Sequence, residues 1–357
     1  MNWKRWSTLL LLIVAVAVMA AGCGDDDDDG DTGADTGDAA TAIQVAPREI
    51  GVVNLIRQSP AEDKIDDLFT QAGETLGWDV EITDGQADPA KIARTVQTYI
   101  NQGKDAIITT STEASLMTRQ LQDARSQGIP VISTNGGTTK SDLFSAQYEE
   151  DEYRMGKQLA DYMNETIENP QIANLGTSIA ISGVLRDNAF HDVFPQSAFA
   201  AEQEVDLADP VGSTERTLTN MLTANQDINA VHAVYDNMSQ AAVTTLLRER
   251  SDAQLFNYFT TQQNVENLRN ETALEAVSDV NLPHTGAVAF DQLLAFFERD
   301  QQIDPNALKK NPLTYEVVTR ENVDDLLGDK DELFSVDEIL QPFVEKWQRE
   351  YGAGGSQ

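Results

Sequence analysis

The sequence predicts an α/β protein with two lobes, each a parallel sheet covered by helices. Short apolar runs typical of buried strands alternate with longer amphipathic stretches of helical period over most of residues 50–259. Strands separated by helices of this length form right-handed βαβ units with parallel strands. The alternation pauses near residue 150 and then restarts, so two similar lobes are expected, both doubly wound.

The first array is expected to hold four strands and three helices. Apolar residues at positions 65, 68, 69, 72 and 76 have the spacing of one helix face. Gly103 follows the next helical stretch and is a natural helix stop. The expected strands are 50–56, 78–82, 106–109 and 128–133, and the expected helices are 65–76, 89–102 and 114–126.

The second array and the C-terminal region continue the alternation. Its expected strands are 178–182, 204–207, 230–235 and 255–259, and its expected helices are 152–167, 188–201, 213–225 and 238–250. Two late strands are expected at 276–282 and 313–319, a helix at 286–299 between them, and a last amphipathic helix at 336–351.

Composition and charge exclude several classes of protein. The chain has 357 residues, of which 41% are hydrophobic, so it can bury a sizeable core. Its formal net charge of −34 argues against binding to nucleic acid and to anionic lipid surfaces. We interpret this acidity as an adaptation to a saline habitat, because salt screens the self-repulsion of such a surface. An ordinary acidic secreted protein is the alternative.

The N-terminus has the pattern of an export signal. Lys4 and Arg5 precede an unbroken apolar run at 9–21, which is shorter than the ~20 residues that a membrane-spanning helix needs. The segment that follows, Ala20-Ala21-Gly22-Cys23, resembles the lipobox of bacterial lipoproteins, although Leu is usual where Ala20 stands. In that family the cysteine carries a diacylglyceryl group. A plain signal peptide with an incidental cysteine is the alternative.

We therefore expect a signal peptide at 1–22 and a lipid-anchored, extracytoplasmic protein that begins at Cys23. Cys23 is the single cysteine, so no disulfide within the chain is possible. Residues 23–47 are rich in Gly, Asp, Thr and Ala and form an expected disordered, acidic tether between lipid and folded body.

The sequence contains no motif of a known catalytic or metal centre. The three histidines do not have zinc-site spacing, and no nucleophile elbow, phosphate-binding loop or dinucleotide fingerprint is present. We expect no enzyme activity, no metal and no cofactor. A glycosidase pair among the many carboxylates is the alternative that the sequence leaves open.

Several segments, in order, resemble the type I periplasmic binding proteins of the ribose-binding kind. They are Asp84–Lys91, Ile100–Ile108, Ala124–Ile132, Asp227–Asp236 and Tyr315–Asp324, and the resemblance covers residues 48–325. It implies two α/β lobes joined by a three-segment hinge. The implied first lobe is 48–147 with 280–310, the second is 148–279 with 311–325, and 326–357 is a C-terminal acidic extension with a helix.

The resemblance places the ligand between the lobes, on loops at the carboxyl ends of strands. The implied ligand-binding residues are Arg57, Gln58, Thr110, Asn135, Arg186, His191, Tyr235, Asp236, Phe259 and Asp279. Asn135 and Phe259 stand where the family often has Asp, and Tyr235 stands where it has Asn. Four of these residues could instead have a purely structural role. Asn135 could form a turn with Gly136, and His191 could lie on the surface. Asp236 could cap the helix that begins at Met238, and Phe259 could belong to the core.

The resemblance implies capture of a sugar or sugar-like solute by hinge closure and delivery to an ABC permease. The protein is expected to be a monomer with a small-molecule ligand and no nucleic-acid partner. A module that senses a solute and presents it to a membrane receptor is the alternative, and a glycan-acting enzyme ranks third.

Overall fold

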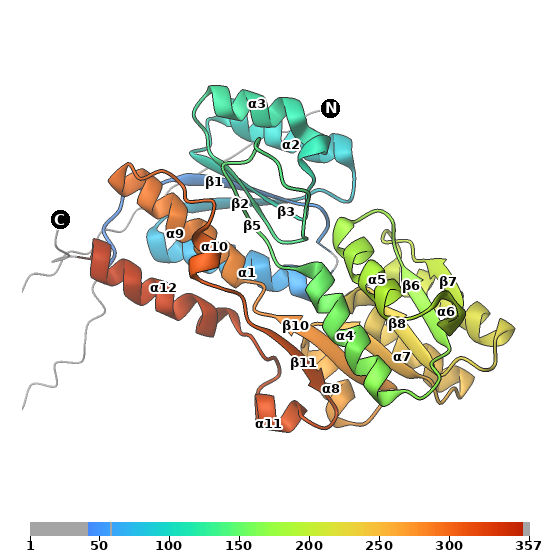
Figure 1. Ribbon diagram of the computed structural model, residues 1–357. Helices are drawn as coiled ribbons and strands as arrows, with labels where there is room; N and C mark the ends of the chain where they lie inside the picture. Colours follow the sequence, from blue (N-terminus) through green and yellow to red (C-terminus); the bar gives the residue numbers. More distant parts are fainter. Residues whose placement is uncertain (1–41, 58, 353–357) are drawn as a thin grey trace, which may run out of the picture. The chain divides into compact units, whose positions relative to one another are not determined.

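The computed structural model describes residues 42–57 and 59–352, whose strands form two sheets (Figure 1). The predicted signal peptide, Cys23, Gln58 and the first part of the predicted tether lie outside the described residues. Within the described ranges, no helix combines the length and apolarity needed to cross a membrane.

The first sheet has the strand order β2-β1-β3-β4-β5, and all of its pairs are parallel. Its strands are β1 (Glu49–Asn54), β2 (Asp79–Asp84), β3 (Ala106–Thr110), β4 (Val131–Thr134) and β5 (Ala146–Tyr148). The helices between them are α1 (Pro60–Leu76), α2 (Pro89–Gln102) and α3 (Thr118–Ser126), the last preceded by a 3-10 turn, η1 (Ala114–Met117). We call this sheet and the helices that pack on it the first lobe.

The second sheet has the order β11-β10-β9-β8-β6-β7. Its strands are β6 (Ile172–Gly176), β7 (Phe199–Glu204), β8 (Ala230–Ala233), β9 (Gln254–Tyr258), β10 (Leu274–Val280) and β11 (Tyr315–Thr319). Only β11 pairs antiparallel among these described strands. The accompanying helices are α4 (Glu152–Thr166), α5 (Ile181–Val193), α6 (Pro210–Ala224), α7 (Ser239–Glu249), α8 (Gln262–Arg269) and α11 (Val323–Leu327), with short 3-10 turns η2 (Gln196–Ala198) and η3 (Asp236–Met238). This is the second lobe.

Three predicted elements of the second lobe are wrong. The predicted strand 204–207 shares only Glu204 with the observed strand β7, which begins five residues earlier. The predicted strand 178–182 is a turn followed by the start of α5, and the strand of this region is β6, at 172–176. The short apolar run in Ser178–Ser182 has the sequence pattern of a strand. In the structure, however, Ile179 is 59% exposed and pairs with no neighbour in the sheet. The predicted helix 188–201 is also wrong, because α5 ends at Val193, before a proline that cannot continue it, and β7 begins at Phe199.

The chain passes between the lobes several times. It leaves the first lobe after β5, returns after β10 to form α9 (His284–Arg299) and α10 (Ala307–Lys310), and joins the second sheet again through β11. After α11 it passes back once more, because α12 (Val336–Tyr351) packs on α1 and α9 (Figure 1). The C-terminal helix is therefore part of the packing of the first lobe.

Candidate ligand-binding site

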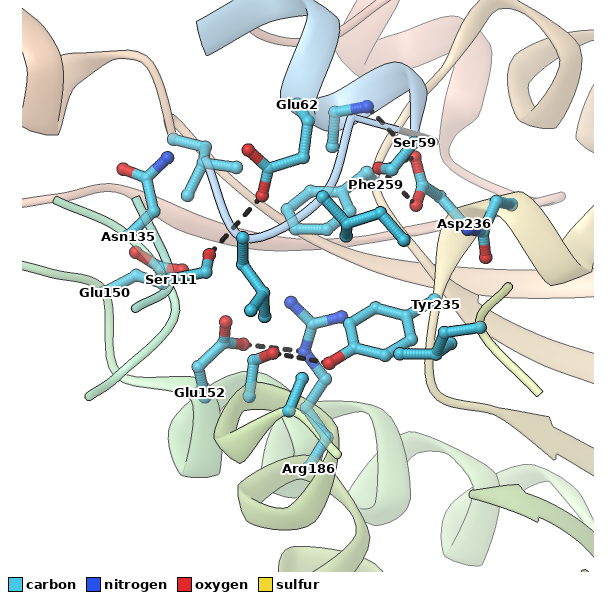
Figure 2. A pocket seen from close by; sticks show the side chains of 18 residues that line it. Ser59, Glu62, Ser111, Asn135, Glu150, Glu152, Arg186, Tyr235, Asp236 and Phe259 are labelled. Carbon is cyan, nitrogen blue, oxygen red and sulfur yellow. Dashed lines mark hydrogen bonds and ion pairs between the residues drawn. The ribbon is translucent and has the colours of Figure 1, made fainter. Parts of the chain in front are cut away.

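A cavity lies where loops of both lobes meet (Figure 2). Its described lining consists of Leu55, Ile56, Ser59, Ala61, Glu62, Ser111, Asn135, Glu150, Glu152, Ala180, Ser182, Arg186, Leu207, Tyr235, Asp236, Asn237, Phe259 and Leu282. Most of these residues follow the carboxyl ends of parallel strands, which is where open α/β sheets bind ligands.

Three lining residues have a left-handed backbone directly after a strand. Ser111 follows β3, Asn135 follows β4 and Phe259 follows β9, with φ of 53°, 61° and 63°. Each of their N–H groups still donates to a carbonyl of the neighbouring strand. Non-glycine residues adopt this conformation rarely, and it persists where the surrounding structure imposes it, often at binding sites. The turn directs all three side chains toward the cavity (Figure 2).

Gly136 allows two cavity walls to approach each other. It has φ of 85°, and a Cβ at this position would lie 2.6 Å from the Cα of Ser111. Its N–H donates to Oε1 of Glu150 over 2.7 Å. The position therefore requires glycine, and its backbone holds the Glu150 carboxyl group beside Ser111.

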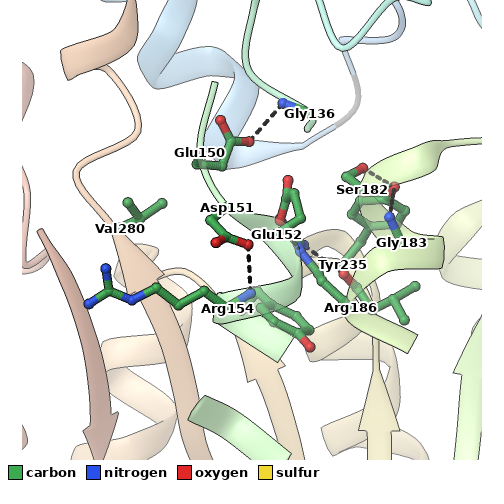
Figure 3. A network of polar contacts seen from close by, with 12 residues as sticks. Gly136, Glu150, Asp151, Glu152, Arg154, Ser182, Gly183, Arg186, Tyr235 and Val280 are labelled. Carbon is green, nitrogen blue, oxygen red and sulfur yellow. Dashed lines mark hydrogen bonds and ion pairs between the residues drawn. The ribbon is translucent and has the colours of Figure 1, made fainter. Parts of the chain in front are cut away.

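Arg186 is the sole cation among the described residues that line the cavity. Its Nε lies 2.6 Å from Oε2 of Glu152, and its Nη1 donates to the carbonyl of Val234 over 2.7 Å (Figure 3). The guanidinium lies 4.3 Å from the ring centroid of Tyr258 and 5.0 Å from that of Phe259. The ion pair is buried, since Arg186 and Glu152 side chains are 2% and 1% exposed.

Tyr235 forms one wall of the cavity. Its hydroxyl lies 2.6 Å from Oγ of Ser182 and accepts the N–H of Gly183 over 3.0 Å (Figure 3). Burial raises the pKa of Tyr235 to about 12, so the phenol stays neutral. The hydroxyl therefore holds the first turn of α5, and it fixes the ring that lines the cavity.

Asp236 joins the two lobes. Its carboxylate accepts the hydroxyl of Ser59 over 2.8 and 2.9 Å and the N–H of Ala61 over 3.0 Å. Ser59 is the N-cap residue of α1 but makes no capping bond with its own side chain. Asp236 thus caps α1 of the first lobe from the second lobe, and a carboxylate there also complements the helix dipole.

Two further carboxyl groups, Glu62 and Glu150, lack a cationic partner in the described structure. Oε1 of Glu62 accepts the hydroxyl of Ser111 over 3.4 Å, and Oε2 of both glutamates is buried without a hydrogen-bond partner. Burial, followed by the charges of Asp66 and Asp236, raises the pKa of Glu62 to about 8. Burial and the neighbouring Glu152 raise the pKa of Glu150 well above its usual range.

Five of the residues expected from the sequence line this cavity: Asn135, Arg186, Tyr235, Asp236 and Phe259. Four others lie elsewhere, and Gln58 lies outside the described residues. Arg57 pairs with Asp66 of α1, and Thr110 is buried at the end of β3. The carboxylate of Asp279 accepts the N–H of Thr260 over 2.9 Å.

His191 lies away from the cavity because of the helical period. It follows Arg186 by five residues on α5, and five steps of about 100° place it on a different side of the helix. Its ring stacks on Phe199 with centroids 4.3 Å apart, and its Nε2 lies 3.0 Å from Glu202.

Sequence reasoning singled out Asp236 but none of the three glutamic acids of the site. The lining residues that it missed include Glu62, Ser111, Glu150, Glu152 and Ser182. Glu150 and Glu152 belong to an acidic run that is typical of a solvated loop, and Glu62 lies in the first turn of an amphipathic helix. Among the residues that the structure describes, no three His, Cys, Asp or Glu side chains are grouped so that they could hold a metal ion.

Two parallel-sheet lobes with a polar cavity between their strand ends define a two-lobed binding protein. Residues 50–299 match the family described as periplasmic binding protein domain, and the chain belongs to this family. This membership confirms the fold and the family that the sequence predicts, and it identifies the chain as a binding protein, not an enzyme.

Similar proteins include curated relatives and solved structures. The chain is 27% identical over 216 residues to the ribose import binding protein RbsB of Salmonella typhimurium, covering 58% of this chain and 70% of the relative. A 5-methylthioribose transporter solute binding protein from Thermotoga lettingae superposes with a TM-score of 0.72 at 14% identity, covering 84% of this chain and 98% of that one. A myo-inositol binding protein from Caulobacter superposes with a TM-score of 0.69 at 17% identity, covering 79% and 98%.

Proposed function

We propose that the protein captures a sugar or sugar-like solute outside the cytoplasmic membrane and delivers it to an ABC permease. The observation that carries this proposal is a cavity whose walls come from both lobes. Rigid aromatic walls beside a few buried polar groups suit a small polyhydroxylated ligand. The relative that imports ribose and the similar structures that bind 5-methylthioribose and myo-inositol support the same class of ligand.

Capture would proceed by closure of the lobes around the solute. The segments between β5 and α4, between β10 and α9, between α10 and β11, and between α11 and α12 would act as hinges, because each joins the two lobes and lies outside their helices and strands. A ligand favours the closed form only through its greater affinity for that form. The bonds from Asp236 to Ser59 and Ala61 would form on closure and break on opening.

Ligand capture should make the protein more compact in solution. D-Ribose, L-arabinose, allitol and myo-inositol would be screened by thermal shift, and small-angle scattering would then be recorded with each sugar that binds. We expect the radius of gyration to fall at saturation, because the solute bridges both lobes. A sugar that binds without any fall in the radius would place the binding site outside the cavity.

Replacing Asn135 by glycine tests the cavity itself. Glycine keeps the left-handed backbone but removes an amide whose Nδ2 is buried and without a partner. We expect Asn135→Gly to weaken binding of the sugar by about 1–3 kcal/mol, the scale of a lost hydrogen bond to a buried group. Asn169→Gly is the matched control, because Asn169 has φ of 52° and does not line the cavity. Equal binding by both variants would rule out this cavity.

We also propose that Cys23 carries a lipid that anchors the protein to the membrane surface. Its place after a small-residue segment and a short apolar run supports this. We expect Cys23→Ser to move the protein from the membrane fraction to the aqueous fraction and to abolish labelling by a radioactive fatty acid. Gly24→Ser is the matched control and should stay at the membrane. Retention of Cys23→Ser at the membrane would contradict the anchor.

A further inference from the structure

The charges of the cavity do not balance. Four carboxyl groups line it, those of Glu62, Glu150, Glu152 and Asp236, and Arg186 is the sole cation among the described lining residues. A neutral sugar needs no such excess, since it can be bound by uncharged groups or by carboxylates that are paired with cations. The distribution of partners among the four acids shows where the excess lies.

Two of the four acids are satisfied within the protein. Glu152 is paired with Arg186 at 2.6 Å, and both side chains are almost fully buried. Asp236 accepts the N–H of Ala61 and the hydroxyl of Ser59 at the positive end of α1. Neither therefore requires a charge from the ligand.

Glu62 and Glu150 are not satisfied in this way. Glu150 is 5% exposed, yet its Oε2 has no hydrogen-bond partner, and the same is true of Oε2 of Glu62. Their other oxygens accept from Ser111 and from the N–H of Gly136, and Ser111 and Gly136 are in close contact. The two carboxyl groups therefore approach the cavity from either side of this contact (Figure 2).

A buried carboxyl group of this kind must either hold a proton or meet a cation. An ionised carboxylate without a partner is costly to bury, and the negative charges of Asp66 and Asp236 near Glu62, and of Glu152 near Glu150, raise that cost. A protonated amine supplies the missing charge together with three N–H donors, which match the free oxygens. The ring of Phe259 also lines the cavity, and aromatic faces attract ammonium groups.

We infer that the solute captured here carries a protonated amine, as an amino sugar or amino polyol does, and that Glu62 and Glu150 bind the ammonium group. This inference rests on the proposed capture of a sugar-like solute in the same cavity. The hydroxyl groups of the solute would then meet the remaining polar groups, among them the free Nδ2 of Asn135.

Proton release follows from the pKa of Glu62, which is raised to about 8 in the empty site. At neutral pH the empty site therefore holds its proton, and an arriving ammonium group favours the ionised form. Binding of an amine should release a proton, and its affinity should fall as the pH falls, because more work is needed to remove that proton. Below about pH 7, an amine with a pKa of about 8 is mostly charged, so the fall in affinity there reports the protonation of the carboxyl group.

The experiment compares matched ligands by isothermal titration calorimetry. One set is D-glucosamine, D-glucose and N-acetyl-D-glucosamine, and the other is 1-amino-1-deoxy-scyllo-inositol and scyllo-inositol. At about pH 6.5 we expect the amine of at least one set to bind roughly ten-fold or more tightly than its neutral counterparts, the scale of one charge-assisted contact. Repeating the titration in buffers of different ionisation enthalpy should show proton release with the amine alone.

Isosteric variants locate the effect. Glu62→Gln and Glu150→Gln should each lower the ratio of amine to neutral affinity, and the double variant should bring it close to one. Glu74→Gln is the matched control, because Glu74 lies on the same helix as Glu62 but is exposed and does not line the cavity. It should leave the ratio unchanged. Thermal melts of each variant check that it folds.

The outcomes separate this inference from the proposed function. Neutral sugars that bind as tightly as the amines, with no proton release, would overturn the inference and leave sugar capture intact, with the two glutamic acids acting as protonated donors. If none of these solutes and no sugar of the screening panel binds or contracts the protein, sugar capture and the inference fail together.

Discussion

Replacing Arg186 with methionine is expected to lower the free energy of unfolding by about 3–5 kcal/mol, the cost of breaking a buried ion pair. The side chains of Arg186 and Glu152 are 2% and 1% exposed and lie 2.6 Å apart. Without the guanidinium, Glu152 remains buried beside Glu150, and two carboxyl groups then repel each other. Urea denaturation, followed by circular dichroism, measures the loss.

A double variant distinguishes the ion pair from simple packing. Arg186→Met with Glu152→Gln removes both charges, so we expect it to recover part of the loss, as neutral replacements of buried pairs often do. Arg119→Met is the matched control, since that side chain is 86% exposed, and it should change stability by at most about 0.5 kcal/mol. A double variant no more stable than the single one would mean that packing, not charge, makes Arg186 important.

Replacing Trp347 with alanine is expected to lower the free energy of unfolding of the first lobe by about 3–5 kcal/mol, as for other buried large aromatic residues. Trp347 is fully buried, and its indole N–H donates to Oδ1 of Asp291 over 3.0 Å. The substitution leaves a cavity between α12 and the helices on which it packs, and it leaves that carboxylate oxygen without this donor.

The position of α12 also connects this residue to the binding site. α12 packs on α1, and α1 carries Glu62 and receives the cap from Asp236. Glu345→Ala is the matched control, because Glu345 is exposed on the same helix, and it should be close to neutral. If Trp347→Ala shifts the urea midpoint no more than Glu345→Ala does, α12 is not part of the cooperative core of the first lobe.

Elements with strong local signals could be predicted closely from the sequence. Helix α2 has the predicted bounds because Asp88 caps its N-terminus, Pro89 opens it and Gly103 ends it with φ of 74°. Each of these signals depends only on residues at the ends of the helix, so it can be recognised from the sequence. Strand β5 has only three residues, too few for their alternation to mark a strand in the sequence, so its place depends on pairing with β4.

The binding residues also differ in whether the local sequence pattern can locate them. Asn135, Tyr235 and Phe259 directly follow strands or lie close to their ends, and the ends of parallel strands can be located from the sequence pattern. Glu62 and Glu150 have no such marker, because an acidic residue in a helix or loop is most often solvated. Glu150 and the Oε2 atom of Glu62 are buried because loops of both lobes converge on them.

The sequence by itself determined the α/β class, the two lobes and the strand ends at which a ligand would bind, because hydrophobic period and helix caps are local properties of the chain. Only the tertiary structure decided which side chains share the cavity, and therefore its charge. Asp236 caps a helix that begins 176 residues earlier, at Pro60, and His191 turns away from the site that Arg186 enters. Burial and charge pairing depend on contacts between residues that are far apart in the sequence. These contacts decide which of the many acidic residues are buried at the binding site.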